Sequence, residues 1–309
     1  MNKVLKRNND FVFMKKIVHN IFLFVIVFVF GGIVAVFSME VYAKHSIPDN
    51  FYVQNYDAIK QTEKLFKDRK TRNLYKEYIK FLAFQTKIPE KYQANFEENM
   101  FSKVMPEKGD IVIDAGIGAC YGGVACEPLK TYAEAVGKEG YVYGFEPFPD
   151  FMKYINKTVQ QNSLQNIKVF PFGLWSENTT KKLCLMDVSS SLVLTYNEFP
   201  EFTNVKVVSL DSFVEENNIK KIDFIKMDIE GAEVDALHGS EKTIKKYKPK
   251  LVIALYHRPE DIFNIMLYIN SLNPDYTYYL GYHAPFDYPF GWEKRRNLML
   301  YAVDETKKK

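Results

Sequence analysis

Short apolar runs separated by amphipathic segments make up the chain from Asp110 onward. Such runs are typical of strands that are buried on both faces of a parallel sheet. The expected strands cover residues 111–115, 141–145, 167–172, 223–227, 250–256, 277–281 and 297–303. Because segments with helical spacing lie between most of these runs, the pattern predicts a doubly wound α/β sheet with helices on both faces. Two further runs, KKLCLM and VKVVSL, predict an added β-hairpin between the third and fourth strands.

The preceding region, residues 44–105, has a different pattern, with apolar positions at helical spacing among many Lys, Glu, Gln and Tyr residues. In LYKEYIKFLAF the apolar positions that share one face are Leu74, Tyr78, Phe81 and Leu82. We expect two or three helices here, forming a stalk or a cap on the next domain. Pro106 and Gly109 mark the boundary, so the α/β domain is predicted to cover residues 106–304.

An uninterrupted apolar run near the N-terminus predicts a membrane anchor. No residue from Ile21 to Phe37 is polar, and segment 17–38 approaches the roughly 20 residues that cross a bilayer. The basic tail, residues 1–16, precedes it, so the positive-inside rule predicts a single-pass protein with a cytoplasmic N-terminus. The alternative is a cleaved secretory signal, because Val41-Tyr42-Ala43 resembles a cleavage site.

Composition narrows the classes of partner. The 309 residues are 47% hydrophobic and 16% aromatic, as in a folded globular protein. Lys and Arg number 41 against 38 Asp and Glu, a balance that indicates no nucleic-acid partner. The three cysteines, Cys120, Cys126 and Cys184, have neither metal-ligand spacing nor the number of a disulfide scaffold.

Candidate ligand-binding residues follow the first predicted strand, in VIDAGIGACYGG. Gly116 and Gly118 allow a sharp turn and a close approach of the backbone to a ligand. A glycine pair alone is weak evidence, but Asp114 stands two positions before it. A carboxylate there would repel a pyrophosphate, whereas it can accept hydrogen bonds from an ammonium group, directly or through water. The motif therefore favours S-adenosylmethionine over NAD.

Two further strand ends complete the predicted cofactor site. Glu146 follows the second strand directly, where an acid can bind both hydroxyls of a ribose. It lies 30 residues after Gly116, and the insertion CEPLKTYAEAVGKEG accounts for the long spacing. After the third strand, FGLWSE places Trp175 and Ser176 where an adenine could stack or be hydrogen-bonded.

These motifs carry a family resemblance. VIDAGIGACYGG, GYVYGFEPFPDF, NIKVFPFGLWSE, VVSLDSF, IDFIKMDIEGAEVDALHGS and LVIALYHRPEDI occur in that order over residues 110–262, and FEPFPDF and IKMDIEGAE are the most specific of them. Together they resemble the FkbM-type S-adenosylmethionine-dependent methyltransferases. The resemblance implies a seven-stranded Rossmann-like methyltransferase sheet with an antiparallel last strand, and O-methylation of a small hydroxylated acceptor, often a sugar or polyketide hydroxyl. The asparagine usual in the first motif is absent here, so no role of that side chain is carried over.

Two residues at strand ends are candidate catalytic groups. Asp228 ends the fourth strand in IKMDIEGAE and is predicted to face the active cleft. His257 ends the fifth, with Asp261 one helical turn later to orient or charge it, and a histidine can exchange a proton near neutral pH. Glu230 and Glu233 are interpreted as acids in the first turn of a helix, where they complement its dipole.

The sequence leaves rival functions open. A single-pass glycosyltransferase would use Asp228-Ile-Glu230 as an acid-x-acid clamp on a metal, although Asp114 and Glu146 would then lack a clear purpose. A non-catalytic interaction protein on a decayed methyltransferase fold is a third hypothesis, which the intact motifs disfavour. Metal involvement and oligomeric state stay open at this point.

Overall fold

The computed structural model describes residues 50–84, 86, 88–94, 104–118, 127–185, 190–194, 201–283 and 297–307. The predicted anchor, residues 17–38, and the basic tail before it lie outside these residues. Among the described helices, none is both long enough and apolar enough to cross a membrane.

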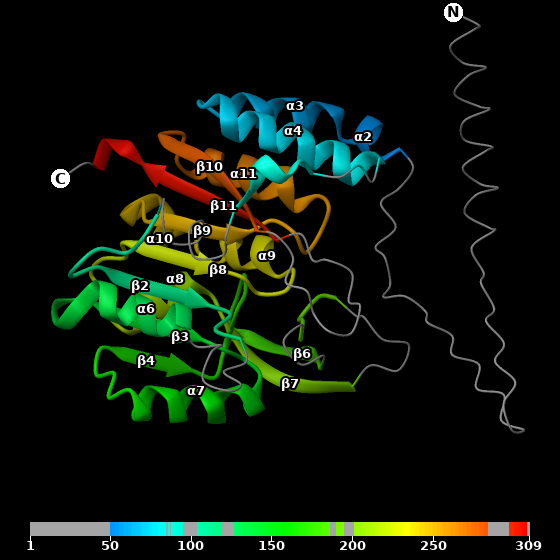
Figure 1. Cartoon of the computed structure of the whole chain (residues 1–309). Helices are drawn as coiled ribbons and strands as arrows, with labels where there is room; N and C mark the ends of the chain where they lie inside the picture. Colours follow the sequence, from blue (N-terminus) through cyan, green and yellow to red (C-terminus); the bar gives the residue numbers. More distant parts are fainter. Residues whose placement is uncertain are drawn as a thin grey trace, which may run out of the picture. The chain divides into compact units, whose positions relative to one another are not determined.

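The main sheet contains the seven predicted strands and one short addition. Its strands, in chain order, are β1 Gln93–Ala94, β2 Ile111–Ala115, β3 Tyr141–Phe145, β4 Ile167–Phe170, β8 Phe224–Met227, β9 Lys250–Ala254, β10 Tyr276–His283 and β11 Asn297–Asp304. In space the order is β1-β10-β11-β9-β8-β2-β3-β4. Figure 1 shows this order from β10 to β4. The last strand, β11, runs antiparallel to β9 and β10, whereas the other pairs are parallel. The predicted α/β sheet is therefore confirmed.

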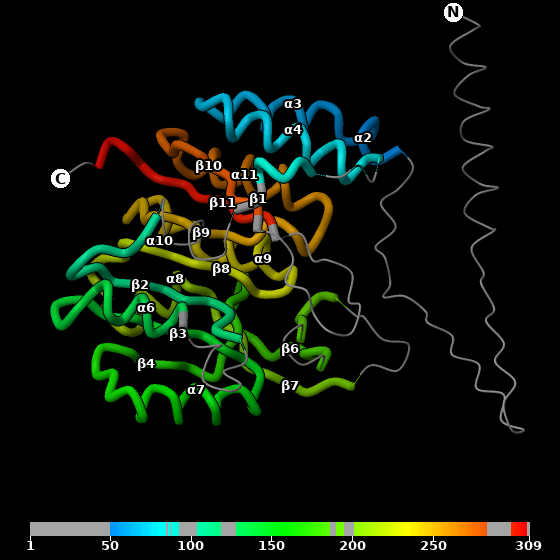
Figure 2. The backbone as a smooth tube through the Cα atoms, in the orientation of Figure 1, coloured from blue at the N-terminus to red at the C-terminus, as the bar shows by residue number. Residues whose placement is uncertain are grey.

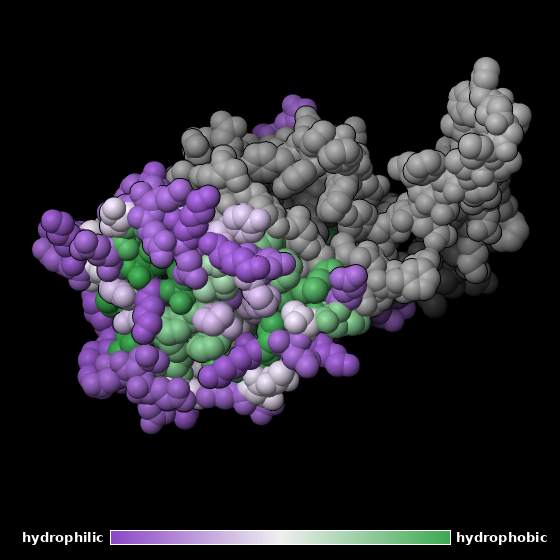
Figure 3. All heavy atoms as spheres, turned by 90° about the horizontal axis from the view of Figure 1, so that it is seen from below, coloured by the Kyte–Doolittle hydropathy of each residue, from purple (hydrophilic) through white to green (hydrophobic). Residues whose placement is uncertain are grey.

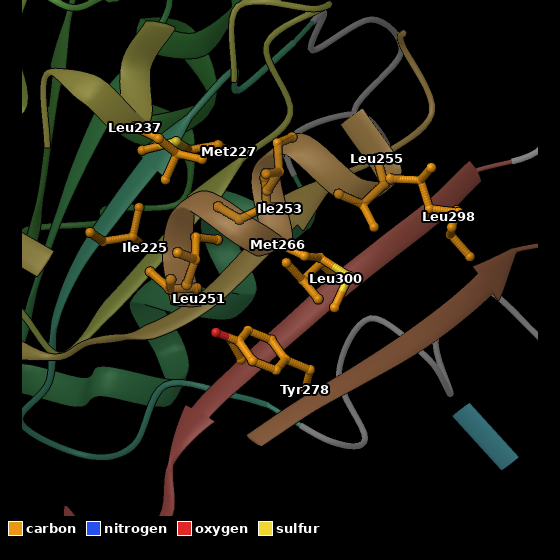
Figure 4. Close-up of a cluster of buried hydrophobic side chains, with 14 of the residues drawn as sticks. Ile225, Met227, Leu237, Leu251, Ile253, Leu255, Met266, Tyr278, Leu298 and Leu300 are labelled. Carbon is orange, nitrogen blue, oxygen red and sulfur yellow. The ribbon is translucent and has the colours of Figure 1, made fainter. Parts of the chain in front are cut away.

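Helices cover both faces of this sheet because successive strand residues point to opposite sides. On one face, Val112 and Phe224 pack with residues of α6 (Glu127–Val136) and α7 (Pro149–Gln161). On the other face, Ile113 and Ile225 pack with residues of the C-terminal helices. Those helices are α8 Leu210–Glu216, α9 Glu233–His238, α10 Glu241–Tyr247 and α11 Asp261–Leu272. Figure 4 shows part of this second layer, where Met266 lies beside side chains of β9 and β11.

The region before the sheet forms a helical cap. Its elements are α2 Phe51–Gln54, α3 Tyr56–Leu65, α4 Arg69–Phe84 and the 3₁₀ turn Glu90–Tyr92. Helix α3 packs against α11, and α4 packs against β10 (Figure 2). Buried cap residues such as Tyr75 and Tyr78 belong to the same hydrophobic cluster as the second layer of the sheet. Within residues 50–94 the predicted helices thus share a core with the α/β domain.

A second, three-stranded sheet lies beside the carboxyl ends of the main strands. It has the order β5-β7-β6, with β5 at Gly173–Leu174, β6 at Thr179–Leu185 and β7 at Glu201–Val208. Strands β6 and β7 are antiparallel, as expected of the added hairpin. Two further 3₁₀ turns cover Gly137–Glu139 and Glu305–Lys307. In the view from below, polar side chains border a band of apolar ones, an ordinary mixture for a protein surface (Figure 3).

Asp304 at the end of β11 contacts three segments that follow other elements: the residue after α11, the residue after α10 and the 3₁₀ turn after β11. It accepts hydrogen bonds from Asn273 Nδ2 at 3.0 Å and from the backbone N–H of Thr306 at 3.0 Å, and Lys248 Nζ lies 3.4 Å away. Burial alone would raise the pKa of Asp304, but the hydrogen bonds from Thr306 and Asn273 outweigh it and lower the pKa to about 2. The ionised carboxylate therefore stabilises the folded state.

We expect Asp304→Asn to lower the free energy of unfolding by about 2 kcal/mol at pH 7. The folded pKa lies below the value of about 3.9 for an unfolded aspartate, so the contribution is complete above pH ~4 and is lost as the pH falls toward 2. Urea denaturation at pH 7, 4 and 3 measures it. Asp275→Asn, which removes an exposed acid that also contacts Lys248, is the control. A deficit for Asp304→Asn that does not shrink at low pH would contradict the assignment.

Candidate active site

The candidate site lies where the strand order of the main sheet reverses. From β2 the chain continues outward to β3 and β4, whereas β8, on the other side of β2, leads to β9. In such sheets ligands bind outside the carboxyl ends of the strands at this point. A cleft is present there, and we call it the switch-point cleft. Residues that line it include Gly116, Ile117, Gly118, Glu146, Pro147, Ser190, Lys226, Asp228, Ile229, Glu230 and Tyr256.

Close backbone packing forms the floor of the switch-point cleft. A Cβ atom at Gly116 would lie 1.9 Å from the carbonyl oxygen of Asp228, and Gly116 has φ +80°. Only glycine fits this position. Gly118 also has a positive φ, +77°, but apart from its chain neighbours no atom of the described residues lies within 4 Å of the position that its Cβ would take. The turn therefore packs tightly against β8 at Gly116 and leaves open space at Gly118, as a cradle for a ligand requires.

Glu146 holds this turn from the neighbouring strand. Its side chain accepts hydrogen bonds from the backbone N–H groups of Gly118 and Phe148, each at 3.0 Å. Burial raises the pKa of Glu146, and these two donors oppose the rise. A carboxylate has about four acceptor positions, so two of them stay available for the hydroxyls of a ribose. Gly116, Gly118 and Glu146 lie together, and their arrangement fits S-adenosylmethionine.

Asp114 lies differently from the prediction. It is 1% exposed and is not among the residues that line the cleft. Lys226, its register partner on β8, places Nζ 3.4 Å from Asp114 Oδ1 and 2.5 Å from the carbonyl oxygen of Gly116. Burial raises the pKa of Asp114, and the ammonium of Lys226 opposes this. Asp114 thus pairs with the ammonium group of Lys226 instead of a ligand's ammonium group. Lys226 lines the cleft, and Asp114 lies behind it.

Trp175 and Ser176 are not brought to the switch-point cleft, whose lining does not include them. Trp175 is buried in a separate cluster with Leu183 and Val207 of the small sheet, and Lys181 Nζ lies 3.9 Å from its ring centroid. Ser176 is exposed. The backbone turns away from the main sheet at β5, so Trp175 packs with the hairpin and Ser176 faces solvent. The predicted adenine contact therefore finds no support in their position.

Asp228 does face the cleft. Its side chain is 31% exposed, and the hydroxyl of Tyr256 at the end of β9 donates a hydrogen bond to Oδ1 at 2.8 Å. The chain turns directly after it through Glu230 and Gly231, which both have positive φ. Ser191 fixes that turn, because its hydroxyl donates to the carbonyl oxygen of Glu230 at 2.6 Å. Asp228 is therefore a cleft carboxylate with an oriented hydrogen-bond partner.

His257 lies behind Asp228, with a side chain only 3% exposed and outside the cleft lining. Its Nδ1 is 2.9 Å from Glu233 Oε1, and its Nε2 is 3.4 Å from Glu230 and 3.6 Å from Asp228. Burial would lower the pKa of His257, but the carboxylates of Glu233 and Glu230 outweigh it and raise the pKa well above its ordinary value. His257 is thus held among acids rather than presented to a substrate.

The two acids that sequence analysis assigned to the helix start contact this histidine. Glu233 is fully buried, and it also accepts the backbone N–H of Ile229 at 2.8 Å. Asp261, the expected partner of His257, accepts the backbone N–H of Arg258 at 3.1 Å instead. Burial raises the pKa of Asp261 to about 7, and the nearby Glu233 adds to the rise. Glu233 therefore takes the orienting role that was expected of Asp261.

Sequence reasoning missed Lys226, Tyr256 and Glu233. Lys226 carries a visible signal, since a charged residue inside the apolar run IDFIKM needs a buried partner. It also lies two positions before Asp228, on the same side of the strand. The partners of Tyr256 and Glu233 come from other elements and have no such local signal.

The Lys226–Asp114 pair is testable by a double-mutant cycle. Lys226→Met leaves a buried acid without its cation, so we expect a loss of about 3–5 kcal/mol in the free energy of unfolding. The double variant Asp114→Asn/Lys226→Met should recover most of it, because both charges are gone. Urea denaturation gives the coupling energy. Lys182→Met, an exposed strand lysine, is the control and should change little. Additive losses in the two single variants would rule the pair out.

Comparison with known proteins shows what this fold is similar to. The solved structure of methyltransferase FkbM from Methylobacillus flagellatus is similar to this chain with a TM-score of 0.62 and 22% identity, over 82% of this chain and 60% of that one. The chain thus spans less than two thirds of that protein. Two weaker likenesses are to structures with a bound ligand. Fibrillarin from Aeropyrum pernix with S-adenosyl-L-methionine has a TM-score of 0.37 and 16% identity, over 66% of this chain and 71% of that one. A putative methyltransferase from Streptococcus mutans in complex with SAH has a TM-score of 0.38 and 11% identity, over 64% of this chain and 90% of that one.

Among curated proteins, none matches the chain. The family model that does match describes the methyltransferase FkbM domain and covers residues 116–280, from the first glycine of the turn into β10. This is more than half of the chain, and it includes Gly116, Glu146 and Asp228. The predicted family and its cofactor, S-adenosylmethionine, are confirmed: the chain belongs to the FkbM methyltransferase family.

Proposed function

We propose that this protein transfers a methyl group from S-adenosylmethionine to a hydroxyl of a sugar, a glycan or another small hydroxylated acceptor. The observation that carries the proposal is the pairing of two features in one cleft. Gly116, Gly118 and Glu146 form its cofactor side, and Asp228 faces the same space from the neighbouring strand. A carboxylate at that position can accept the hydrogen bond of an acceptor hydroxyl.

The charge of the cleft supports a neutral, hydroxylated acceptor. Asp228 and Glu230 both line it, and the hydroxyl of Tyr256 already donates to Asp228. Carboxylates accept hydrogen bonds and repel other anions, so phosphorylated or carboxylated groups are disfavoured next to them. Sugar hydroxyls are suitable donors for such a surface. The acceptor class is thus inferred from the acids of the cleft.

The protein's own contribution is positioning. When bound, the cofactor supplies a methyl group on a sulfonium, which is already a good leaving group. Glu146 and the Gly116–Gly118 turn hold the cofactor side. Asp228 orients the acceptor hydroxyl and accepts its proton as the methyl group moves from sulfur to the hydroxyl oxygen. His257 contacts Asp228 from behind and keeps its carboxylate in place, so it is a positioning residue in this scheme. Correct placement of the two reactants is the main catalytic effect available here.

A glycosyltransferase is the second candidate function, because Asp228 and Glu230 form an acid-x-acid pair at the cleft. Membership in a methyltransferase family argues against it. A methyltransferase and a glycosyltransferase bind different small molecules, so ligand binding is measured first.

For that test, calorimetry of the full chain in detergent uses S-adenosylhomocysteine, and then UDP-sugars with Mn²⁺. We expect S-adenosylhomocysteine alone to bind. Turnover is measured as transfer of a labelled methyl group to mono- and oligosaccharide acceptors. Asp228→Asn should lower kcat by about 10² while cofactor affinity stays unchanged, because the acceptor is misplaced. Glu146→Gln should weaken cofactor binding about tenfold, the loss of about one hydrogen bond to a charged group.

Asp235→Asn on α9 is the control, since this half-exposed acid lies outside the cleft lining. Binding of UDP-sugar without S-adenosylhomocysteine would exclude methyl transfer. Wild-type turnover in Asp228→Asn would remove this residue from the acceptor side. If none of the hydroxylated acceptors receives a labelled methyl group, the proposed acceptor class is overturned.

We also propose that the protein is anchored in a membrane by residues 17–38, with the N-terminus in the cytoplasm. The support is the apolar run and the basic residues before it. We expect the full-length protein to stay in the membrane pellet after alkaline carbonate extraction, and a variant lacking residues 1–38 to be released. Protease protection in sealed vesicles should leave the tagged N-terminus accessible from the cytosolic side. A mature chain that begins after Ala43 would instead identify a cleaved signal.

A further inference from the structure

A cluster of acids around one histidine lies next to the switch-point cleft. Asp228, Glu230 and Glu233 each form an ion pair with His257, at 3.6, 3.4 and 2.9 Å. Asp228 and Glu230 reach the cleft, whereas Glu233 and His257 are buried behind them. The cluster therefore extends from the acceptor side of the cleft into the protein interior.

The charges of this cluster do not balance internally. One imidazole carries at most one positive charge, and three carboxylates share it. A fourth acid, Asp261, is also close enough to act on His257. Among the described residues, the neighbouring cations are directed elsewhere: Arg258 Nη2 lies 3.9 Å from Asp235, and Lys226 pairs with Asp114. Buried charges in proteins are normally paired or coordinate metals, so the excess of acids favours a bound cation.

Three of these side chains already have the separation of a metal-ligand set. Asp228, Glu233 and His257 each offer one donor atom, and the three atoms lie within 4.8 Å of one another. A second observation is independent of this spacing. Glu233 is 0% exposed, and its Oε2 atom receives no hydrogen bond from any described residue. A fully buried carboxylate oxygen without a donor is costly unless a cation completes it.

We propose that Asp228, Glu233 and His257 form a site for a divalent metal ion at the acceptor side of the cleft. Two carboxylates and one imidazole are a mixed oxygen and nitrogen donor set. Such a set suits Mn²⁺, Fe²⁺ or Zn²⁺ better than it suits Ca²⁺, which prefers oxygen ligands alone. Glu230 adds negative charge at the rim of the site. If the proposed O-methylation holds, an ion held there would be bound by Asp228, which lines the cleft, and would supply a Lewis acid to polarise the acceptor hydroxyl.

The binding itself does not depend on the acceptor, so it is tested without turnover. The purified full chain, freed of metal with a chelator, is titrated with Mn²⁺ and followed by electron paramagnetic resonance. We expect one Mn²⁺ per chain and electron spin-echo modulation from one histidine nitrogen. Asp228→Asn should weaken Mn²⁺ binding at least about tenfold, and His257→Asn should also abolish the nitrogen modulation. Zn²⁺ should displace the bound Mn²⁺.

Asp235→Asn is the matched control, because it removes an acid from the same helix as Glu233 but outside the cluster, and it should bind Mn²⁺ like the wild type. Binding of S-adenosylhomocysteine checks that each variant is folded, and Asp228→Asn replaces His257→Asn if the latter fails to fold. Failure of Mn²⁺ and Zn²⁺ to bind at millimolar concentration would overturn the proposal. Binding without nitrogen modulation, or unaffected by either substitution, would overturn it too. Metal binding without methylation of any hydroxyl would refute only the acceptor proposal.

Discussion

The contact of the β2 turn with the end of β8 is the constraint on which the site depends. The carbonyl oxygen of Asp228 lies where a side chain at Gly116 would begin, so the two strand ends can meet only because this residue is glycine. The backbone N–H of Asp228 in turn donates to the carbonyl oxygen of Ala115 at 3.1 Å. This contact brings the proposed cofactor side and the proposed acceptor side of the cleft to adjoining positions. Methyl transfer needs such proximity more than it needs acid–base help.

Buried charge is distributed unevenly around this contact. Beneath the cofactor turn, Asp114 and Lys226 form a one-to-one pair, and Lys226 also binds the carbonyl oxygen of Gly116. On the other side of the contact, Asp228, Glu230 and Glu233 share His257. The first arrangement stabilises the turn through a compensated ion pair. The second leaves negative charge next to the cleft, which agrees with a neutral, hydroxylated acceptor and with a cation held among the acids.

Much of the fold was predictable because it depends on local pattern. The apolar runs marked the seven main strands, with ends displaced by at most two residues, as at β4, β9 and β10. The glycine turn and Glu146 were also found, because strand ends in a doubly wound sheet converge on one edge. Trp175 was misplaced for a related reason. It follows an apolar run that looked like part of the sheet, but the chain turns there into β5 and the small sheet.

By itself, the sequence determined the order of strands and helices, the switch point and the residue types at the strand ends, since periodicity and glycine placement act over short distances. The partner of each buried charge was decided by the tertiary structure. The β2–β8 register pairs Asp114 with Lys226, and the turn after β8 brings Glu233, rather than Asp261, to Nδ1 of His257. Burial then determines whether solvent or a cation compensates the charge of each acid. An acid at a helix start is satisfied by solvent when exposed, but Glu233, fully enclosed, requires a positive partner.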